Sequence, residues 1–216
     1  MNIRRAKFVS AMVVVGLLAV LGILFTASNT SQNLSAAACK EDFVMEKEKN
    51  ALVVCYSFSN GNTRKIAREL QKALNADYAE IEPVVPYPPY GGWDSEVTRQ
   101  GKREVESGFR PEIKPLAVNV EDYDIVAIGT PTWWFAPAPP ILTFLDSHDW
   151  RGKTVIPFMT HGGWPGHVIA DIKELCAGAK FAPSMEIQFD SQGGADMFTK
   201  QAEINAWIEG LKNDLH

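Results

Sequence analysis

Residues 51–67, ALVVCYSFSNGNTRKIA, join an apolar run to a helical pattern through a loop of hydroxyl and amide side chains. The run at 51–56 is rich in Val and Leu, and its length is typical of a buried strand. The pattern that follows places Ile66, Leu70 and Leu74 on one helical face. The loop directs several hydrogen-bond donors at one point before a helix N-terminus, whose partial positive charge attracts phosphate. The stretch therefore predicts a strand, an anion-binding loop and a helix.

The rest of the chain repeats this alternation of strand and helix. Four more apolar runs are predicted to be strands, at 78–83, 123–129, 153–159 and 184–189. Helical patterns lie between and after the strands, at 63–74, 94–106, 139–147, 167–176 and 201–211. Such alternation predicts an α/β fold, in which helices cover both faces of a mostly parallel sheet.

The first 50 residues differ in character from the rest. Residues 8–25 carry no charge and follow Arg4, Arg5 and Lys7. A helix over this run rises about 27 Å, close to the roughly 30 Å of a bilayer's hydrocarbon core. We therefore predict three parts, which are a signal or membrane-anchor segment at 1–27, a polar linker at 28–50 and a folded domain at 51–216.

More than one fate is open to this leader. The small residues SAAA at 35–38 are typical of a signal-peptidase site, so cleavage and anchoring are both compatible with the sequence. Cys39 follows directly and is either a candidate for lipidation, as in bacterial lipoproteins, or a plain linker cysteine. Positive charge before the apolar run favours an extracytoplasmic domain that is membrane-anchored or secreted.

Composition limits what the domain can bind. The chain has 216 residues, 46% of them apolar, and a net charge of −5, which suits one globular domain. Residues 1–38 hold three basic residues and no acid, so residues 39–216 carry −8 and are not expected to bind nucleic acid. Cys55 and Cys176 lie in apolar patterns typical of core residues, and no Cys or His spacing predicts a metal site.

Two later loops also follow apolar strands and have unusual composition. Loop 129–140, GTPTWWFAPAPP, places Trp133 beside Trp134, which favours a flat ligand, the alternative being that one of them covers the core. Loop 160–167, THGGWPGH, supplies glycines that allow close approach of the backbone. Ligands of open α/β sheets bind beyond the carboxyl ends of the strands, where these loops lie. Hydrogen-bond donors for a phosphate, aromatic side chains and flexible glycine backbone together suit a ligand that joins a phosphate to a flat ring. Flavin mononucleotide, FMN, has that shape.

Missing motifs narrow the type of phosphate ligand. Neither G-x-x-x-x-G-K-[ST] nor G-x-G-x-x-G occurs, so a nucleoside triphosphate loop and a dinucleotide fingerprint are not predicted. A monophosphate held by neutral donors and a helix dipole fits the first loop better. Plainer interpretations remain open, in which Asn62 or Thr63 only caps the helix and His161 is a hydrogen-bonded structural residue.

Three motifs in this order resemble the flavodoxins, and in particular the flavodoxin-like subgroup with a THGG loop. They are YSFSNGNTRKIA, IGTPTWWFAPAPPILTFL and GKTVIPFMTHGGWPGHVIADIKEL, and the resemblance spans residues 51–213. It implies a three-layer, doubly wound, five-stranded parallel sheet with strand order 2-1-3-4-5, and FMN as cofactor. The first loop is one residue longer than the common S-x-T-G-N-T form, and Trp164 stands where the subgroup usually has Ser.

The resemblance also implies which residues of this chain bind FMN. The phosphate would be held by Ser57, Ser59, Asn60, Gly61, Asn62 and Thr63. One border of the ring would be formed by Pro131, Thr132, Trp133, Trp134 and Phe135. The other edge would be formed by His161, Gly162, Gly163 and Trp164. A backbone carbonyl in the Gly162–Gly163 region is expected to accept a hydrogen bond from N5–H of FMN.

The expected function is electron transfer with a redox partner protein, in which FMN does the redox chemistry and the protein sets its potentials. One alternative is an FMN-dependent quinone or NAD(P)H reductase. The chain has no nicotinamide-binding domain and no Arg cluster for a second phosphate, which favours the carrier. The other alternative is a membrane-tethered binding module that has kept the fold without flavin.

Overall fold

The computed structural model describes residues 50–215. The predictions for residues 1–49, which are the signal or anchor segment, the linker and lipidation at Cys39, lie outside the described residues. Between residues 50 and 215, no helix is both long and apolar enough to cross a membrane.

Strands and helices alternate along the domain, as predicted. The strands are β1 (Ala51–Cys55), β2 (Asp77–Glu80), β3 (Ile125–Trp133), β4 (Ala136–Pro137), β5 (Thr154–His161), β6 (Lys180–Phe181) and β7 (Met185–Gln188). The helices are α1 (Asn62–Ala73), α2 (Glu96–Ser107), α3 (Pro139–Asp146), α4 (Val168–Leu175) and α5 (Gln201–Leu215), with a single 3-10 turn, η1 (Val120–Asp122). Every predicted run and helical pattern overlaps one of these elements.

The strands form one mostly parallel sheet, in which β2, β1, β3 and β5 are neighbours in that order and both β6 and β7 pair with β5. The five predicted strands therefore lie in the order 2-1-3-4-5, and the predicted fold class is confirmed. The described sheet has seven strands rather than five. Of the two extra strands, β6 lies on the edge with β7, separated from it by Pro183, which has no N–H to continue the ladder. The other, β4, runs antiparallel to the end of β3.

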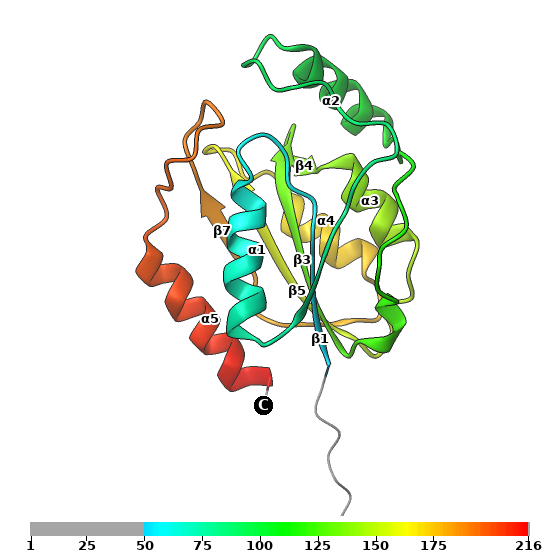
Figure 1. Cartoon of the computed structure of the whole chain (residues 1–216), viewed down its shortest axis with the longest axis vertical. Helices are drawn as coiled ribbons and strands as arrows, with labels where there is room; N and C mark the ends of the chain where they lie inside the picture. Colours follow the sequence, from blue (N-terminus) through cyan, green and yellow to red (C-terminus); the bar gives the residue numbers. More distant parts are fainter. Residues whose placement is uncertain (1–49, 216) are drawn as a thin grey trace, which may run out of the picture. The chain divides into compact units, whose positions relative to one another are not determined.

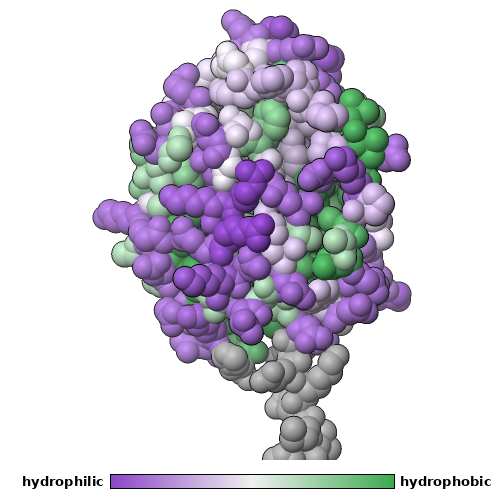
Figure 2. All heavy atoms as spheres, in the orientation of Figure 1, coloured by the Kyte–Doolittle hydropathy of each residue, from purple (hydrophilic) through white to green (hydrophobic). Residues whose placement is uncertain are grey.

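Apolar side chains fill two layers, one on each face of the sheet. On one face the helices α1 and α5 pack against the strands, and on the other face α3 and α4 do so (Figure 1). Cys55 belongs to the first layer and Cys176 to the second, and both are buried core residues, as predicted. The surface around the outer side of α1 is largely hydrophilic (Figure 2). The architecture therefore has three layers.

Helix α2 does not cover a face of the sheet. It lies beyond the carboxyl ends of the strands, above the loops that leave β1 and β3 (Figure 1). Two of its residues, Val97 and Gly101, are buried. A Cβ atom at Gly101 would lie 3.0 Å from the ring of Trp133, so the absence of a side chain there lets α2 approach the end of β3. The long connection between β2 and β3 thus forms a cover over the carboxyl edge.

Candidate functional site

The loop between β1 and α1 presents free backbone donors at the start of a helix. Ser59 and Gly61 have φ angles of 55° and 73°, which turn the chain sharply before α1 begins at Asn62. The N–H of Arg64 donates to Ser57 Oγ at 3.1 Å, and the N–H of Lys65 donates to the Gly61 carbonyl at 2.9 Å. No acceptor within residues 50–215 is bonded to the N–H groups of Asn62 and Thr63. These two donors are therefore available to an anion.

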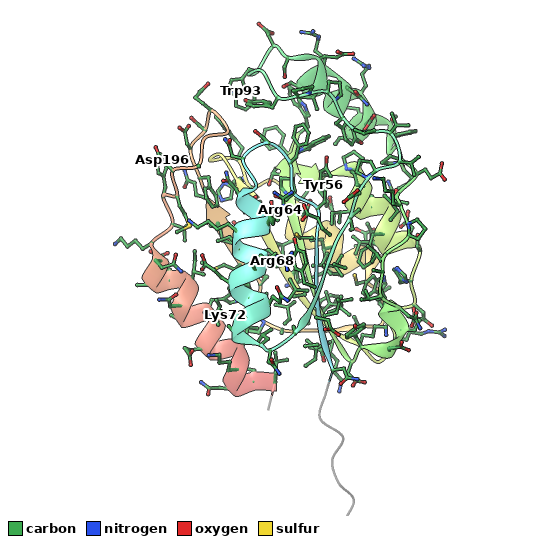
Figure 3. The ribbon with its side chains drawn as sticks, in the orientation of Figure 1. Tyr56, Arg64, Arg68, Lys72, Trp93 and Asp196 are labelled. Carbon is green, nitrogen blue, oxygen red and sulfur yellow. The ribbon has the colours of Figure 1, made fainter. Side chains whose placement is uncertain are left out.

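The first cationic side chain after the loop, Arg64, is paired with an acidic residue of β2 and lies beside Gly61, where a Cβ atom would be 3.1 Å from its Nη1. The Arg64 guanidinium donates to both carboxylate oxygens of Glu80, with Nε 2.8 Å from Oε2 and Nη2 2.6 Å from Oε1. Glu80 hydrogen-bonding raises the pKa of Arg64 above its ordinary value. Arg64 lies on the outer side of α1 with Arg68 and Lys72 (Figure 3). Arg64 is not among the residues that line the cavity described below, so the loop offers that cavity neutral N–H groups.

The amide side chains of the first loop bond to a loop that follows β7. Asn62 Nδ2 donates to the Gly194 carbonyl at 2.9 Å, and Asn60 Nδ2 donates to the Gly193 carbonyl. A Cβ atom at Gly193 would lie 2.9 Å from the ring of Tyr90, which belongs to the connection before α2. The loop after β7 is therefore held between the first loop and Tyr90. This contact between the two loops was not predicted.

The chain after β3 makes a tight hairpin at the carboxyl edge. β3 and β4 are joined by two residues only, Trp134 and Phe135, whose φ angles of 49° and 69° are both positive. Two-residue turns with both φ angles positive usually contain Asn or Gly, because bulky residues are strained there. Trp134 Nε1 donates to the Thr98 carbonyl of α2 at 3.0 Å. The side chains of Trp134 and Phe135 stay 37% and 49% exposed, so the strain holds two large apolar groups at the surface.

Trp133 has a different environment from Trp134. Its ring centroid lies 5.5 Å from that of Phe58 and 4.9 Å from that of Tyr87, both in edge-to-face geometry. The ring also packs under Gly101 of α2 and against the core layer. Trp133 therefore covers the core, as the sequence allowed for one of the two adjacent tryptophans. It also lines the cavity described below.

The end of β5 contributes a histidine, and the loop that follows it contributes three glycines and an exposed tryptophan. His161 ends β5, and its Nδ1 accepts a hydrogen bond of 3.0 Å from the Gly163 N–H. Gly163 has a φ angle of 107°, which favours glycine. Trp164 stands edge-to-face with Trp93 of the connection before α2, at a centroid distance of 5.6 Å. Trp93 lies near the start of α2 (Figure 3).

These segments line a cavity of about 520 Å³ at the carboxyl edge of the sheet. Twelve of the predicted site residues line it, which are Ser59, Asn60, Asn62, Thr63, Pro131, Thr132, Trp133, Trp134, Phe135, His161, Gly162 and Trp164. Three others lie outside the lining, which are Ser57, Gly61 and Gly163. The residues that were not predicted are Phe58, Tyr90, Trp93, Val97, Thr98, Gly101, Thr160, Phe189, Asp190, Ser191 and Gly193. Aromatic residues in a Pro-rich connection were the one sequence signal for Tyr90 and Trp93.

Neutral groups dominate the cavity. Asp190 is the only Asp, Glu, Lys or Arg among the described lining residues. Burial lowers the pKa of His161, and the negative charge of Glu186 partly opposes this effect. The buried hydroxyls of Thr63 and Thr160, two of the lining residues, are 2.8 Å apart and hydrogen-bond to each other. Among residues 50–215, no cluster of His, Cys, Asp and Glu has the arrangement of a metal site. Chemically, the cavity suits a flat ligand with an anionic end.

Comparisons with known proteins agree with this geometry. A model of the flavodoxin family matches residues 50–209, whereas no curated protein matches the sequence. A candidate flavoprotein from Bacteroides eggerthii is 28% identical, with a TM-score of 0.57 over 74% of this chain and 96% of that one. A second, from Bacteroides uniformis, is 25% identical, with a TM-score of 0.60 over 76% and 99%. A flavoprotein from Lactobacillus acidophilus, solved in complex with FMN, is 22% identical, with a TM-score of 0.53 over 74% and 98%.

Proposed function

This chain belongs to the flavodoxin family, and on that premise we propose that it binds FMN and transfers electrons to or from a protein partner. The observation that carries the proposal is an aromatic cavity, lined almost wholly by uncharged residues, with the unbonded N–H groups of a helix N-terminus at its edge. FMN combines a phosphate with a flat ring and supplies the redox chemistry when bound. The residues of the cavity fit both parts of it.

The phosphate end of the site relies on the backbone. The N–H groups of Asn62 and Thr63 have no acceptor within the described domain and lie where the dipole of α1 is positive. The amide groups of Asn60 and Asn62 are bonded to the loop after β7, and the Ser57 hydroxyl is bonded to the helix. We infer that these three side chains shape the anion site, while the backbone supplies its donors. Direct phosphate contacts by the individual side chains stay predictions.

The ring end of the site is aromatic and poor in charge. Trp134 and Phe135 at the hairpin tip, with Trp93 and Trp164 from two other segments, supply flat surfaces that exclude water. Asp190 is the only carboxylate in the lining, and no cationic side chain of the described domain lines the cavity to balance extra negative charge. An anionic ring is disfavoured in such surroundings, which lowers the potential for addition of a second electron.

The leader and the charge of the chain support a proposed location and a proposed kind of partner. The uncharged run at 8–25 and Cys39 support an extracytoplasmic domain, either tethered to the membrane or secreted. The partner would then be a redox protein of the same compartment. A net charge of −8 beyond residue 38 favours a partner with a basic docking surface.

A reductase of quinones is the second candidate function. The Trp93–Trp164 pair gives the cavity another aromatic surface, against which a flat substrate can stack. NAD(P)H is a poorer candidate, because the lining of the described cavity has no Lys or Arg for its phosphates.

One spectroscopic experiment separates these functions. The full chain is mixed with FMN, desalted and then reduced by light in steps while its absorption is recorded. Retained flavin that passes through a distinct one-electron stage supports the carrier. Retained flavin that takes up two electrons without such a stage favours the reductase, as does rapid bleaching by a reduced nicotinamide. A chain that retains no flavin would leave the tethered binding module as the function.

A further inference from the structure

His161 holds one peptide group of the cavity in a fixed orientation. Its backbone is anchored by the sheet, because His161 pairs with Gln188 of β7 and its carbonyl accepts from the Phe189 N–H at 2.8 Å. Its imidazole Nδ1 accepts from the Gly163 N–H at 3.0 Å. The ring therefore bonds to the peptide group that joins Gly162 to Gly163.

This bond determines where the carbonyl of the same peptide group is directed. In a trans peptide the N–H and C=O groups point in opposite directions. With the N–H held against the imidazole, the Gly162 oxygen is directed away from it. Gly162 lines the cavity, and no donor within residues 50–215 is bonded to its oxygen. A hydrogen-bond acceptor is thus left over for a ligand.

The surroundings leave the peptide group little other support. A Cβ atom at Gly162 would lie 3.0 Å from Ser191 Cα and 3.2 Å from the Asp190 carbonyl oxygen, so one side is tightly packed. Gly163 is exposed, and a Cβ atom there would find only the Gln188 side chain, at 3.6 Å. Two consecutive glycines can adopt other backbone angles at little steric cost. Among residues 50–215, the side chain that accepts a hydrogen bond from the Gly163 N–H is the His161 imidazole.

We propose that His161 is a positioning residue which, as the neutral tautomer with its proton on Nε2, orients the Gly162–Gly163 peptide so that the Gly162 carbonyl faces the ligand. The proposal deepens the proposed function, because the ligand in question is the donor edge of the FMN ring. An imidazolium has a proton on Nδ1 and cannot accept the Gly163 N–H. Protonation therefore releases the peptide and makes the orientation of the carbonyl depend on pH.

The groups near the imidazole agree with a neutral ring at physiological pH. Burial lowers the pKa of His161, and Glu186 of β7 acts in the opposite direction. From the loop after β7, Asp190 lines the same cavity, and Tyr90 lines it from the connection before α2. The residues that line the cavity from the loop after β3 are Trp134 and Phe135, and those from the loop after β5 are Gly162 and Trp164. All four are uncharged. Burial is the larger of these two effects on the His161 pKa, so protonation of the ring and release of the peptide fall on the acid side of the ordinary histidine range.

Two substitutions distinguish a bonded imidazole from one that only fills space. In His161→Asn the side-chain oxygen stands close to the position of Nδ1 and can accept the Gly163 N–H without titrating. In His161→Gln the amide is one carbon further out, and this acceptor is lost. The apoprotein full chain, labelled with ¹⁵N, is studied by NMR, which reports the Gly163 amide shift and its hydrogen exchange.

In the native chain we expect the Gly163 amide shift to titrate with the same midpoint as the His161 ring. We expect Gly163 exchange in His161→Gln to be about fivefold faster than in His161→Asn at every pH, the effect of one ordinary hydrogen bond. The native chain should match His161→Asn above the midpoint and His161→Gln below it. A Gly163 amide that does not follow the ring, or equal exchange in the two variants, would overturn the proposal.

The loaded protein gives an independent readout. If FMN binds, its reduction potential should be nearly the same in the native chain and His161→Asn at neutral pH, and shifted in His161→Gln. Equal reduction potentials in all three proteins would contradict an effect of the Gly162–Gly163 peptide on the FMN ring. If FMN does not bind at all, the proposed function fails, whereas the NMR result on the apoprotein still tests the role of His161.

Discussion

Gly166→Ala is the substitution that best tests how two walls of the cavity are joined. Gly166 has a φ angle of 66°, and a Cβ atom there would lie 2.0 Å from the Phe135 carbonyl oxygen and 2.4 Å from Phe135 Cα. The next residue, His167, donates its N–H to the same carbonyl at 2.8 Å. An added methyl group must therefore push the β3–β4 hairpin away from the loop after β5 and break this bond.

The cost has two parts that a control variant separates. An alanine at positive φ costs about 1–2 kcal/mol, and overpacking against backbone costs a further ~1–3 kcal/mol. Gly108 has nearly the same φ angle, 65°, but a Cβ atom there would meet nothing within 4 Å. Gly108→Ala should therefore cost only the backbone part. Gly166→Ala should cost about 2–5 kcal/mol in total.

Urea unfolding of both variants measures the difference. With a slope of about 2 kcal/mol per molar urea, the midpoint should fall by roughly 0.5–1 M for Gly108→Ala and by roughly 1–2.5 M for Gly166→Ala. Retention of FMN should also fall in Gly166→Ala, because Phe135 lines the cavity. Equal midpoints for the two variants would refute the idea that close packing joins these loops.

Three further predictions concern strain, a buried hydroxyl pair and a buried thiol. Replacing Trp134-Phe135 by Asn-Gly should raise the free energy of unfolding by about 1–2 kcal/mol, because both positions have positive φ. The same change should decrease the retention of FMN. Unchanged stability in urea would argue against backbone strain at these positions. Thr63→Val should lower the free energy of unfolding by about 1–3 kcal/mol, because it leaves the Thr160 hydroxyl without a partner. Adding Thr160→Val should restore part of that free energy, which thermal unfolding of the single and double variants would measure. Burial raises the pKa of Cys55 from 9.0 to about 12, so the folded state holds this proton more tightly than the unfolded chain, and stability should be lost as the pH rises through that interval. In Cys55→Val the alkaline loss of stability should be smaller, and an identical loss would contradict this cause.

Much of the fold was predictable, because the signals lie within single elements. The five apolar runs and the helical patterns each identify their element by local periodicity, as at Ile66 and Leu70. The strand β6 was missed because it has two residues, too few to show a periodic pattern. The hairpin to β4 was missed for a different reason. Its turn residues are Trp134 and Phe135, whereas turn chemistry favours Asn and Gly.

The site was predictable where it follows directly after strands. Loops after β1, β3 and β5 had to meet at the carboxyl edge of a parallel sheet, so residues such as Asn62 and Trp134 could be placed together. The cover from α2 and the loop after β7 could not be predicted in this way. Tyr90 and Gly193 approach each other across a long sequence separation, and only tertiary packing brings them together.

The central claim is that the cavity holds FMN with its phosphate at the N-terminus of α1. The most direct test is a fluorescence titration of the full chain with FMN and, separately, with riboflavin, which has the same ring and no phosphate. Hydrogen bonds to a charged group are worth about 1.5–3 kcal/mol each, so FMN should bind at least roughly tenfold more tightly than riboflavin, and both should be quenched by the aromatic walls. Equal affinities for the two flavins, or no binding of either, would contradict the account.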